Sequence, residues 1–309
     1  MHQTLSGILN SITDASGRME RFAVLVKELI AKHDVRQLKD LVDCMLAEES
    51  PFALFARPIL QQVAEQMEKL KNVELKELAL HTLEKLRGRV VSFEEEDFVI
   101  RELLCEVFQA EEEWTEAAKC LTAINLETGT RCRTPLQKAE KYVKIAELYL
   151  EDDDAVSADT YCGRAAHVIH DVSDVPLQLR YKVCHARILD NKRKFLEAAS
   201  KYCDLSQQTF GGQIHEGDLV QLLKHAVTCA ILAPAGPQRS RILALLSKVA
   251  AKMISESRLD GYIDQKSQII HFHSDDINLQ QWDRHIQNVC NQVNNVLLRI
   301  KELDAMKEG

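Results

Sequence analysis

Hydrophobic residues recur at helical spacing along most of the chain, and short polar breaks separate the apolar stretches. Ser92-Phe93-Glu94-Glu95 has the form of a capping box, in which a Ser hydroxyl and a Glu three residues later satisfy free amides at a helix start. Thr134-Pro135 indicates a second helix start, and Asp174 with Pro176 indicates a third. The breaks delimit helices of roughly 12–18 residues in the middle of the chain. This pattern predicts an all-α fold.

Three of the predicted helices share one order of small and large residues. Their starting positions lie 41 and 40 residues apart, and each has an aliphatic residue seven positions earlier. The copies are Trp114 with Ala117, Ala118 and Leu121; Ala155 with Ala158 and Cys162; and Phe195 with Ala198, Ala199 and Tyr202, preceded by Val107, Leu148 and Ile188. Weaker copies start at Val35 and Leu75. Small residues let a neighbouring helix approach closely, so the period predicts a solenoid of TPR- or HEAT-like helical hairpins. A non-repetitive helical bundle is the alternative.

The pattern changes near residue 234. Residues 233–237 read Ala-Pro-Ala-Gly-Pro and must interrupt a helix, because neither proline can donate a backbone hydrogen bond. Two short apolar-polar alternations follow at 258–264 and 268–273, and they predict a β-hairpin. A helix followed by a hairpin suggests the end of a winged helix. A lone hairpin is only marginally stable without a third strand or a packed helix.

The last segment carries a regular apolar seam. Its residues alternate between spacings of three and four, which is the pattern of a and d positions over about three heptads. The seam consists of Leu279, Trp282, Ile286, Val289, Val293, Val296, Ile300 and Leu303. A terminal helix packed on its own domain would also carry an apolar face, but a regular seam favours a bundle with helices of other chains. We predict that these residues form a partner interface.

Composition and charge exclude several classes of fold and function. The chain has 309 residues with only 11 Gly and 6 Pro, which disfavours turn-rich β folds, and 46% hydrophobic residues suffice for a core. A net charge of −8 argues against nonspecific binding to polyanions. The strongest apolar stretch, 226–233, is too short to cross a bilayer, and the polar start has no signal-peptide pattern. The nine widely spaced Cys include no C-x-x-C and indicate free thiols. We expect a soluble intracellular protein.

Candidate chemistry is sparse. His271-x-His273 places two imidazoles on one side of a strand, but Gln281 stands where a metalloprotease of the H-x-H type would need its Ser. The acidic runs 94–97, 111–113 and 151–154 lie at helix starts or turns, where we expect them to stay hydrated, and they lack calcium-loop spacing. Lys192-Arg193-Lys194 indicates a salt-bridged turn. No phosphate-binding or nucleophile motif occurs. We therefore predict no catalytic residue, cofactor or metal.

Several segments carry a resemblance to a known family. Residues 84–96, 124–129, 142–154, 181–190, 236–241, 260–264 and 282–300 resemble the PCI-domain family, and within it subunits of the COP9 signalosome. The resemblance covers the chain from about residue 75 onward. In the family, the helix ending near Leu246 leads into further helices and the front half of a winged helix, whereas here Leu246 is followed directly by Ser247. The comparison therefore implies an internal deletion at Leu246/Ser247 that leaves the winged helix incomplete, with one β-hairpin.

The resemblance also implies an organisation and a role. Residues 1–185 would form the repeat solenoid, 186–275 a PCI domain with an incomplete winged helix, and 276–309 a bundle helix. The protein would be a cytoplasmic and nuclear, non-catalytic scaffold that contacts other PCI subunits, the isopeptidase subunit and cullin-RING ligases during removal of NEDD8. It would bind neither nucleic acid nor membranes. A proteasome-lid PCI subunit is the alternative in the same class. A winged-helix DNA-binding protein using Lys248, Lys252 and Arg258, or a hydrolase using His271 and His273, are alternatives in other classes.

Overall fold

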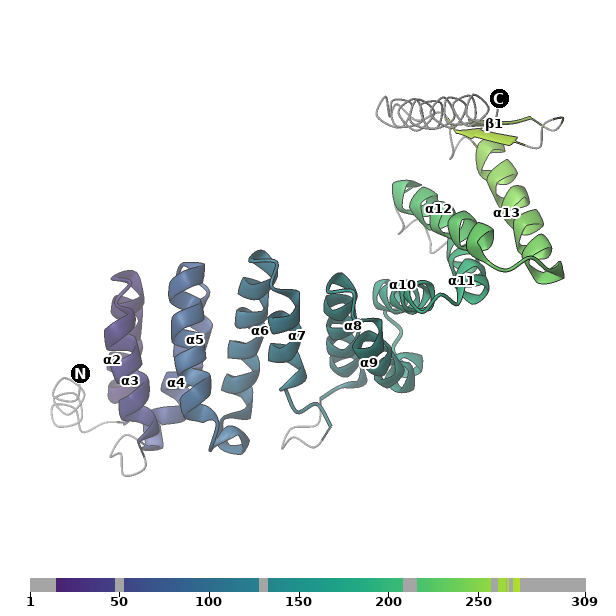
Figure 1. Cartoon of the computed structure of the whole chain (residues 1–309). Helices are drawn as coiled ribbons and strands as arrows, with labels where there is room; N and C mark the ends of the chain where they lie inside the picture. Colours follow the sequence, from purple (N-terminus) through teal and green to yellow (C-terminus); the bar gives the residue numbers. More distant parts are fainter. Residues whose placement is uncertain are drawn as a thin grey trace, which may run out of the picture.

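In its described residues, the chain forms a row of helical hairpins followed by a small hairpin of strands (Figure 1). The computed structural model describes residues 15–47, 53–127, 133–207, 216–256, 261–264, 266 and 269–272. The elements of these segments are α2 (Ala15–Ala31), α3 (Val35–Leu46), α4 (Ala53–Met67), α5 (Asn72–Leu86), η1 (Val90–Phe93), α6 (Glu94–Ala110), α7 (Trp114–Thr122), α8 (Pro135–Glu151), α9 (Ala155–Val168), η2 (Ile169–Asp171), α10 (Val175–Asn191), α11 (Phe195–Gln207), α12 (Glu216–Leu232), α13 (Pro237–Ser255), β1 (Gly261–Asp264) and β2 (Ile269–Phe272). The predicted all-α fold is confirmed.

Successive hairpins stack, and several helices contact their counterparts in the next hairpin. The first helices α2, α4 and α6 contact one another in order, as do α8 and α10, and the second helices α3 and α5 do the same. Figure 1 shows α2 to α9 as a row of roughly parallel helices, after which α10 to α13 turn away from the row. This is the predicted helical-repeat solenoid, in which each unit contacts mainly its neighbours.

The repeated sequence pattern coincides with the structural repeat. Trp114, Ala155 and Phe195 are each the first residue of the second helix of a hairpin, in α7, α9 and α11. The small residues after them are fully buried, at 0% exposure for Ala117, Ala118, Ala158, Ala198 and Ala199. The aliphatic residues seven positions earlier, Val107, Leu148 and Ile188, are also buried. The small side chains thus lie at helix contacts, where a larger residue would separate the layers.

The same turn closes four of the hairpins. The turn residues His33, Glu112, Asp153 and Arg193 have φ of 53°, 59°, 57° and 58°, in the left-handed region. In each turn the next amide donates to a carbonyl five residues earlier, from Asp34 to Leu29, Glu113 to Phe108, Asp154 to Tyr149 and Lys194 to Leu189, at 2.9–3.2 Å. This is a Schellman-type helix end, which most often uses Gly at the left-handed position. None of the four residues is Gly, so each turn retains some backbone strain.

Side-chain caps set several helix starts. Thr134 and Gln137 form a reciprocal capping box at α8, and the Asp174 carboxylate accepts from the Leu177 amide at α10, as predicted. The capping box predicted at Ser92 is wrong. Ser92 lies within the 3-10 turn η1, which runs directly into α6, and Phe93 precedes α6 without a side-chain cap. The helical backbone begins before Ser92, so its hydroxyl is not at the chain position where the free amides lie.

The helix α13 carries the strand hairpin away from the repeats. It begins at Pro237, after the predicted break, and its buried residues Leu246, Ala250 and Met253 lie on one face. The Leu246–Ser247 join therefore falls inside a continuous helix whose apolar face runs across it. Strands β1 and β2 pair antiparallel, with Tyr262 opposite His271. The assignment of this hairpin to an incomplete winged helix stays a prediction, as do the domain limits, of which 185/186 lies within α10.

Candidate partner-binding surfaces

The predicted seam lies outside the described residues. Every seam residue from Leu279 to Leu303 falls in 273–309, so the interface stays a prediction. Of the two strand histidines, His273 is also outside the described residues. His271 is exposed on β2, and its ring stacks on Tyr262 across the hairpin with centroids 4.6 Å apart. Among the described residues, no group of three or more His, Cys, Asp or Glu side chains could hold a metal ion.

Ion pairs join neighbouring hairpins along the stack. Partners lie in adjacent units, so their sequence separations follow the repeat, between 33 and 39 residues. The pairs are Lys39–Glu77 at 2.6 Å, Lys76–Glu111, Lys141–Glu102, Arg180–Glu147 at 2.6 Å and Arg187–Glu151 at 2.8 Å. The predicted salt-bridged turn is present too, because Lys192 pairs with Asp159 at 2.7 Å. Exposed pairs stabilise little, about 0–1 kcal/mol each, but they favour one alignment of adjacent hairpins.

One acidic run is less hydrated than we expected. Glu96 and Asp97, in the first turn of α6, are each only 3% exposed. Arg101 lies one turn later and its Nε donates to Asp97 at 2.7 Å, while Arg57 from α4 approaches Glu96 at 3.7 Å. The expectation of a solvated run is wrong for these two carboxylates. Stacking of α4 on α6 covers the start of α6, which the local sequence does not reveal.

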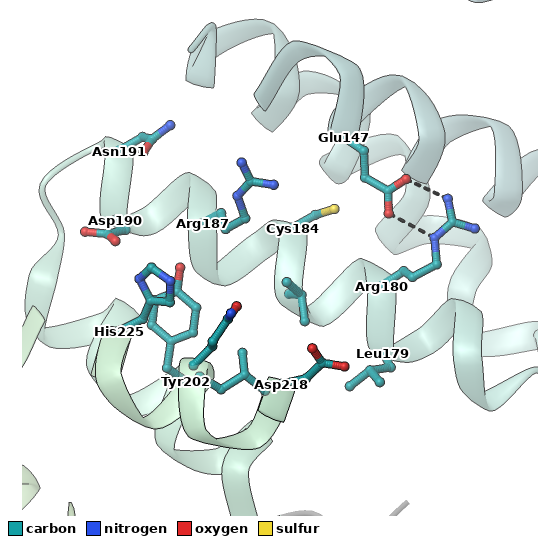
Figure 2. Close-up of a pocket in the computed structure, with 13 residues that line it drawn as sticks. Glu147, Leu179, Arg180, Cys184, Arg187, Asp190, Asn191, Tyr202, Asp218 and His225 are labelled. Carbon is teal, nitrogen blue, oxygen red and sulfur yellow. Dashed lines mark hydrogen bonds and ion pairs between the residues drawn. The ribbon is translucent and has the colours of Figure 1, made fainter. Parts of the chain in front are cut away.

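A groove opens where the stack turns away from its first direction. It has a volume of about 590 Å³ and is formed by α8, α10, α11 and α12 (Figure 2). Its lining comprises the apolar or buried Leu179, Val183, Cys184, Tyr202 and Leu222 and the polar Glu147, Arg180, Arg187, Asp190, Asn191, Asp218, Gln221 and His225. Figure 2 shows polar side chains of α10 and α12 around this opening, with Tyr202 of α11 beneath it. The groove has no local sequence motif that would predict it, because its residues come from four helices.

Charge in the groove is partly neutralised by ion pairs. Arg180 donates from Nε and Nη2 to the two oxygens of Glu147, at 2.9 and 2.6 Å, and this bidentate contact raises the pKa of Arg180. Arg187 is held by Glu151 outside the groove. Burial, followed by the nearby Asp190 carboxylate, raises the pKa of Tyr202, so that the phenol stays neutral. Its ring stacks on His225 with centroids 5.5 Å apart.

Burial keeps several of the described thiols in their protonated form. Seven Cys in the described segments form no disulfide, and five of them are buried. Burial raises the pKa of Cys105, Cys120 and Cys162 to about 11, and it raises the pKa of Cys184, which lines the groove. The nucleophilic form of Cys is the thiolate, which is scarce at neutral pH when the pKa is raised. These side chains therefore serve packing.

Stacked hairpins with an open groove define a class of protein. The described chain is an α-helical solenoid, and solenoids of this kind use their extended surfaces to bind other macromolecules. Residues 8–211 match the family described as PSMD12/CSN4, N-terminal. The chain belongs to this family.

Three similar proteins share one name. The chain is 32% identical to COP9 signalosome complex subunit 4 of Arabidopsis thaliana, in an alignment that covers 93% of this chain and 95% of the relative. It is 29% identical to the protein of that name from Drosophila melanogaster, over 97% and 94% of the two chains, and 28% identical to that from Dictyostelium discoideum, over 95% of each. The predicted resemblance is confirmed.

The relatives carry residues that this chain lacks. The alignment with the Arabidopsis thaliana protein extends over 378 positions, more than the 309 residues of this chain. This difference agrees with an internal deletion, and the position of the join at Leu246/Ser247 stays a prediction. In the segments that the structure describes, no helix is long and apolar enough to cross a membrane.

Proposed function

We propose that this chain is a non-catalytic scaffold subunit of the COP9 signalosome. The observation that carries the proposal is similarity at 28–32% identity, over at least 93% of this chain, to three proteins named COP9 signalosome complex subunit 4. Its architecture supports a scaffold role, because stacked hairpins present large surfaces. Its raised thiol pKa values and the lack of a metal-binding group among the described residues give no support to a catalytic role.

The partners follow from the proposed role. The other PCI subunits and the isopeptidase subunit would bind this chain, and the assembled complex would act on cullin-RING ligases to remove NEDD8. The repeats α2 to α9 would face the substrate and the isopeptidase subunit. We place the subunit in the cytoplasm and the nucleus, which fluorescence imaging of the tagged chain would test. A proteasome-lid role is less favoured, since all three relatives are named as signalosome subunits.

The apolar seam would anchor the chain in a helical bundle of the complex. Co-expression of the full chain with the other signalosome subunits, followed by native mass spectrometry, tests this assignment. We expect one copy per complex for the unmodified chain and loss of that copy for the Ile286→Asp/Val293→Asp variant, because a charge in a helix seam must be desolvated. The matched control is Gln287→Asp/Asn294→Asp, which adds the same charge outside the seam.

The outcomes separate the two claims. Exclusion of the unmodified chain, with a full-length relative incorporated in parallel, would overturn its role as a subunit. Incorporation of both double variants at the same level would leave the subunit role intact and refute the anchoring role of the seam.

A further inference from the structure

The groove between α10 and α12 presents uncompensated negative charge. Both of its Arg side chains are held by carboxylates, Arg180 by Glu147 at 2.6–2.9 Å and Arg187 by Glu151 at 2.8 Å. Asp190 on α10, which accepts a hydrogen bond from the Cys229 thiol, and Asp218 on α12 remain as the charged groups that no Arg or Lys of the groove neutralises. An occupant would therefore meet two carboxylates and would be favoured by a cationic side chain.

Between the carboxylates lies an apolar floor. Leu179 and Val183 are half-buried on α10, and Leu222 of α12 lies across from them. The Tyr202 ring, only 2% exposed, closes the bottom of the groove, where His225 stacks on it. The volume of about 590 Å³ is within the usual range for a ligand site and leaves room for a side chain to enter between the two helices. Burial of an apolar side chain here would remove its surface and that of Leu179 and Val183 from water.

We propose that this groove binds a segment of another subunit in which an apolar side chain is flanked by Lys or Arg. The apolar side chain would rest on Leu179, Val183 and Leu222, and the cations would reach Asp190 and Asp218. This inference rests on the proposed function, because the partner is a subunit of the same complex. A protein segment suits the site better than a small molecule, since the groove is formed by stacked repeats and its rim residues Gln221 and His225 are exposed to solvent.

The experiment places a photo-crosslinker in the groove of the assembled complex. The full chain, with p-benzoylphenylalanine in place of Gln221, is co-expressed with the signalosome subunits, irradiated and mapped by mass spectrometry. We expect a crosslink to one subunit segment with an apolar residue next to Lys or Arg. The same probe at Lys224, exposed on α12 but outside the groove lining, is the matched control and should not reach that segment.

Charge reversal then tests the recognition. Asp218 is exposed, so Asp218→Lys leaves the core intact, and Asp190→Lys is added to it in a second variant. Asp190 is half-buried, and we expect the double reversal to lower the crosslink yield about tenfold, as the loss of two charge contacts at the groove surface predicts. Asp204→Lys repeats the single charge reversal of Asp218→Lys at an exposed site on α11 outside the groove and should leave the yield unchanged.

The possible outcomes distinguish a failure of the groove assignment from a failure of the proposed function. Three results would overturn the groove assignment alone, provided that the chain is incorporated into the complex. They are no crosslink from position 221, a crosslink to an acidic segment, or equal crosslink yields for Asp218→Lys/Asp190→Lys and Asp204→Lys. Absence of the unmodified chain from the complex, read by native mass spectrometry in the same preparation, would overturn the proposed function and the groove assignment with it.

Discussion

Substitution of Ala117 by Leu tests whether the small residues of the repeat set the spacing of the helices. Ala117 is at 0% exposure in α7, which contacts both α6 and α8. Leucine adds three carbon atoms at this contact. If spare volume existed there, their burial would stabilise the fold by about 2 kcal/mol, from roughly 0.8 kcal/mol for each carbon. In a close-packed contact the same atoms force shifts of the helices, which costs about 1–3 kcal/mol.

We expect the second result, since the small residue recurs with the repeat. The assay is urea unfolding of the full chain followed by circular dichroism, with the free energy of unfolding compared between variants. Ala198→Leu in α11, also at 0% exposure, should lower the stability by a similar amount. The matched control is Ala244→Leu, because Ala244 is exposed on α13 and the change there adds the same atoms without a packed neighbour.

The test depends on whether the free energy of unfolding falls or rises in the leucine variants. A stability equal to that of the unmodified chain or higher, for both Ala117→Leu and Ala198→Leu, would refute the close-contact argument. A loss of the same size for Ala244→Leu would show that leucine acts through something other than packing between repeats.

Two further predictions concern the turns between helices. Glu112→Gly should raise the free energy of unfolding by about 0.5–1 kcal/mol, because relief of the left-handed backbone strain (about 1–2 kcal/mol) exceeds the entropic cost of the freedom that Gly adds to the unfolded chain. The control Glu116→Gly, inside α7, should lower the free energy of unfolding. Thermal unfolding of both variants measures the two changes. Asp154→Ala should cost about 1 kcal/mol near pH 7, since the carboxylate accepts from the amides of Val156 and Ser157. The hydrogen bond from the Ser157 side chain, followed by those from the backbone amides, lowers the pKa of Asp154, so its contribution is complete above the unfolded pKa and is lost as pH falls through the folded one. Urea unfolding at about pH 7 and about pH 2 should therefore show the difference only at the higher pH, and an equal difference at both would contradict the assigned cause.

Much of the fold could be predicted because helices and their repeats are local. Trp114, Ala155 and Phe195 mark equivalent helix starts through their own neighbours. Thr134 and Asp174 cap helices through amides three residues away. The helix cap predicted at Ser92 is wrong because that prediction, too, used only the local sequence. Its motif is formally complete, yet the backbone before it is already helical, and only the folded chain shows where the helix begins.

The sequence by itself determined the helical repeat, the membership of the family and the break before Pro237, since each depends on residue order within one or two helices. The tertiary structure alone decided which charges meet and where the surface is hollow. Glu96 is buried because α4 stacks on α6, and Arg180 is held by Glu147, 33 residues earlier. The groove above Tyr202 exists because α8, α10, α11 and α12 come together at the change in direction of the stack. Contacts between helices depend on how they pack, and periodicity specifies only which face each helix buries.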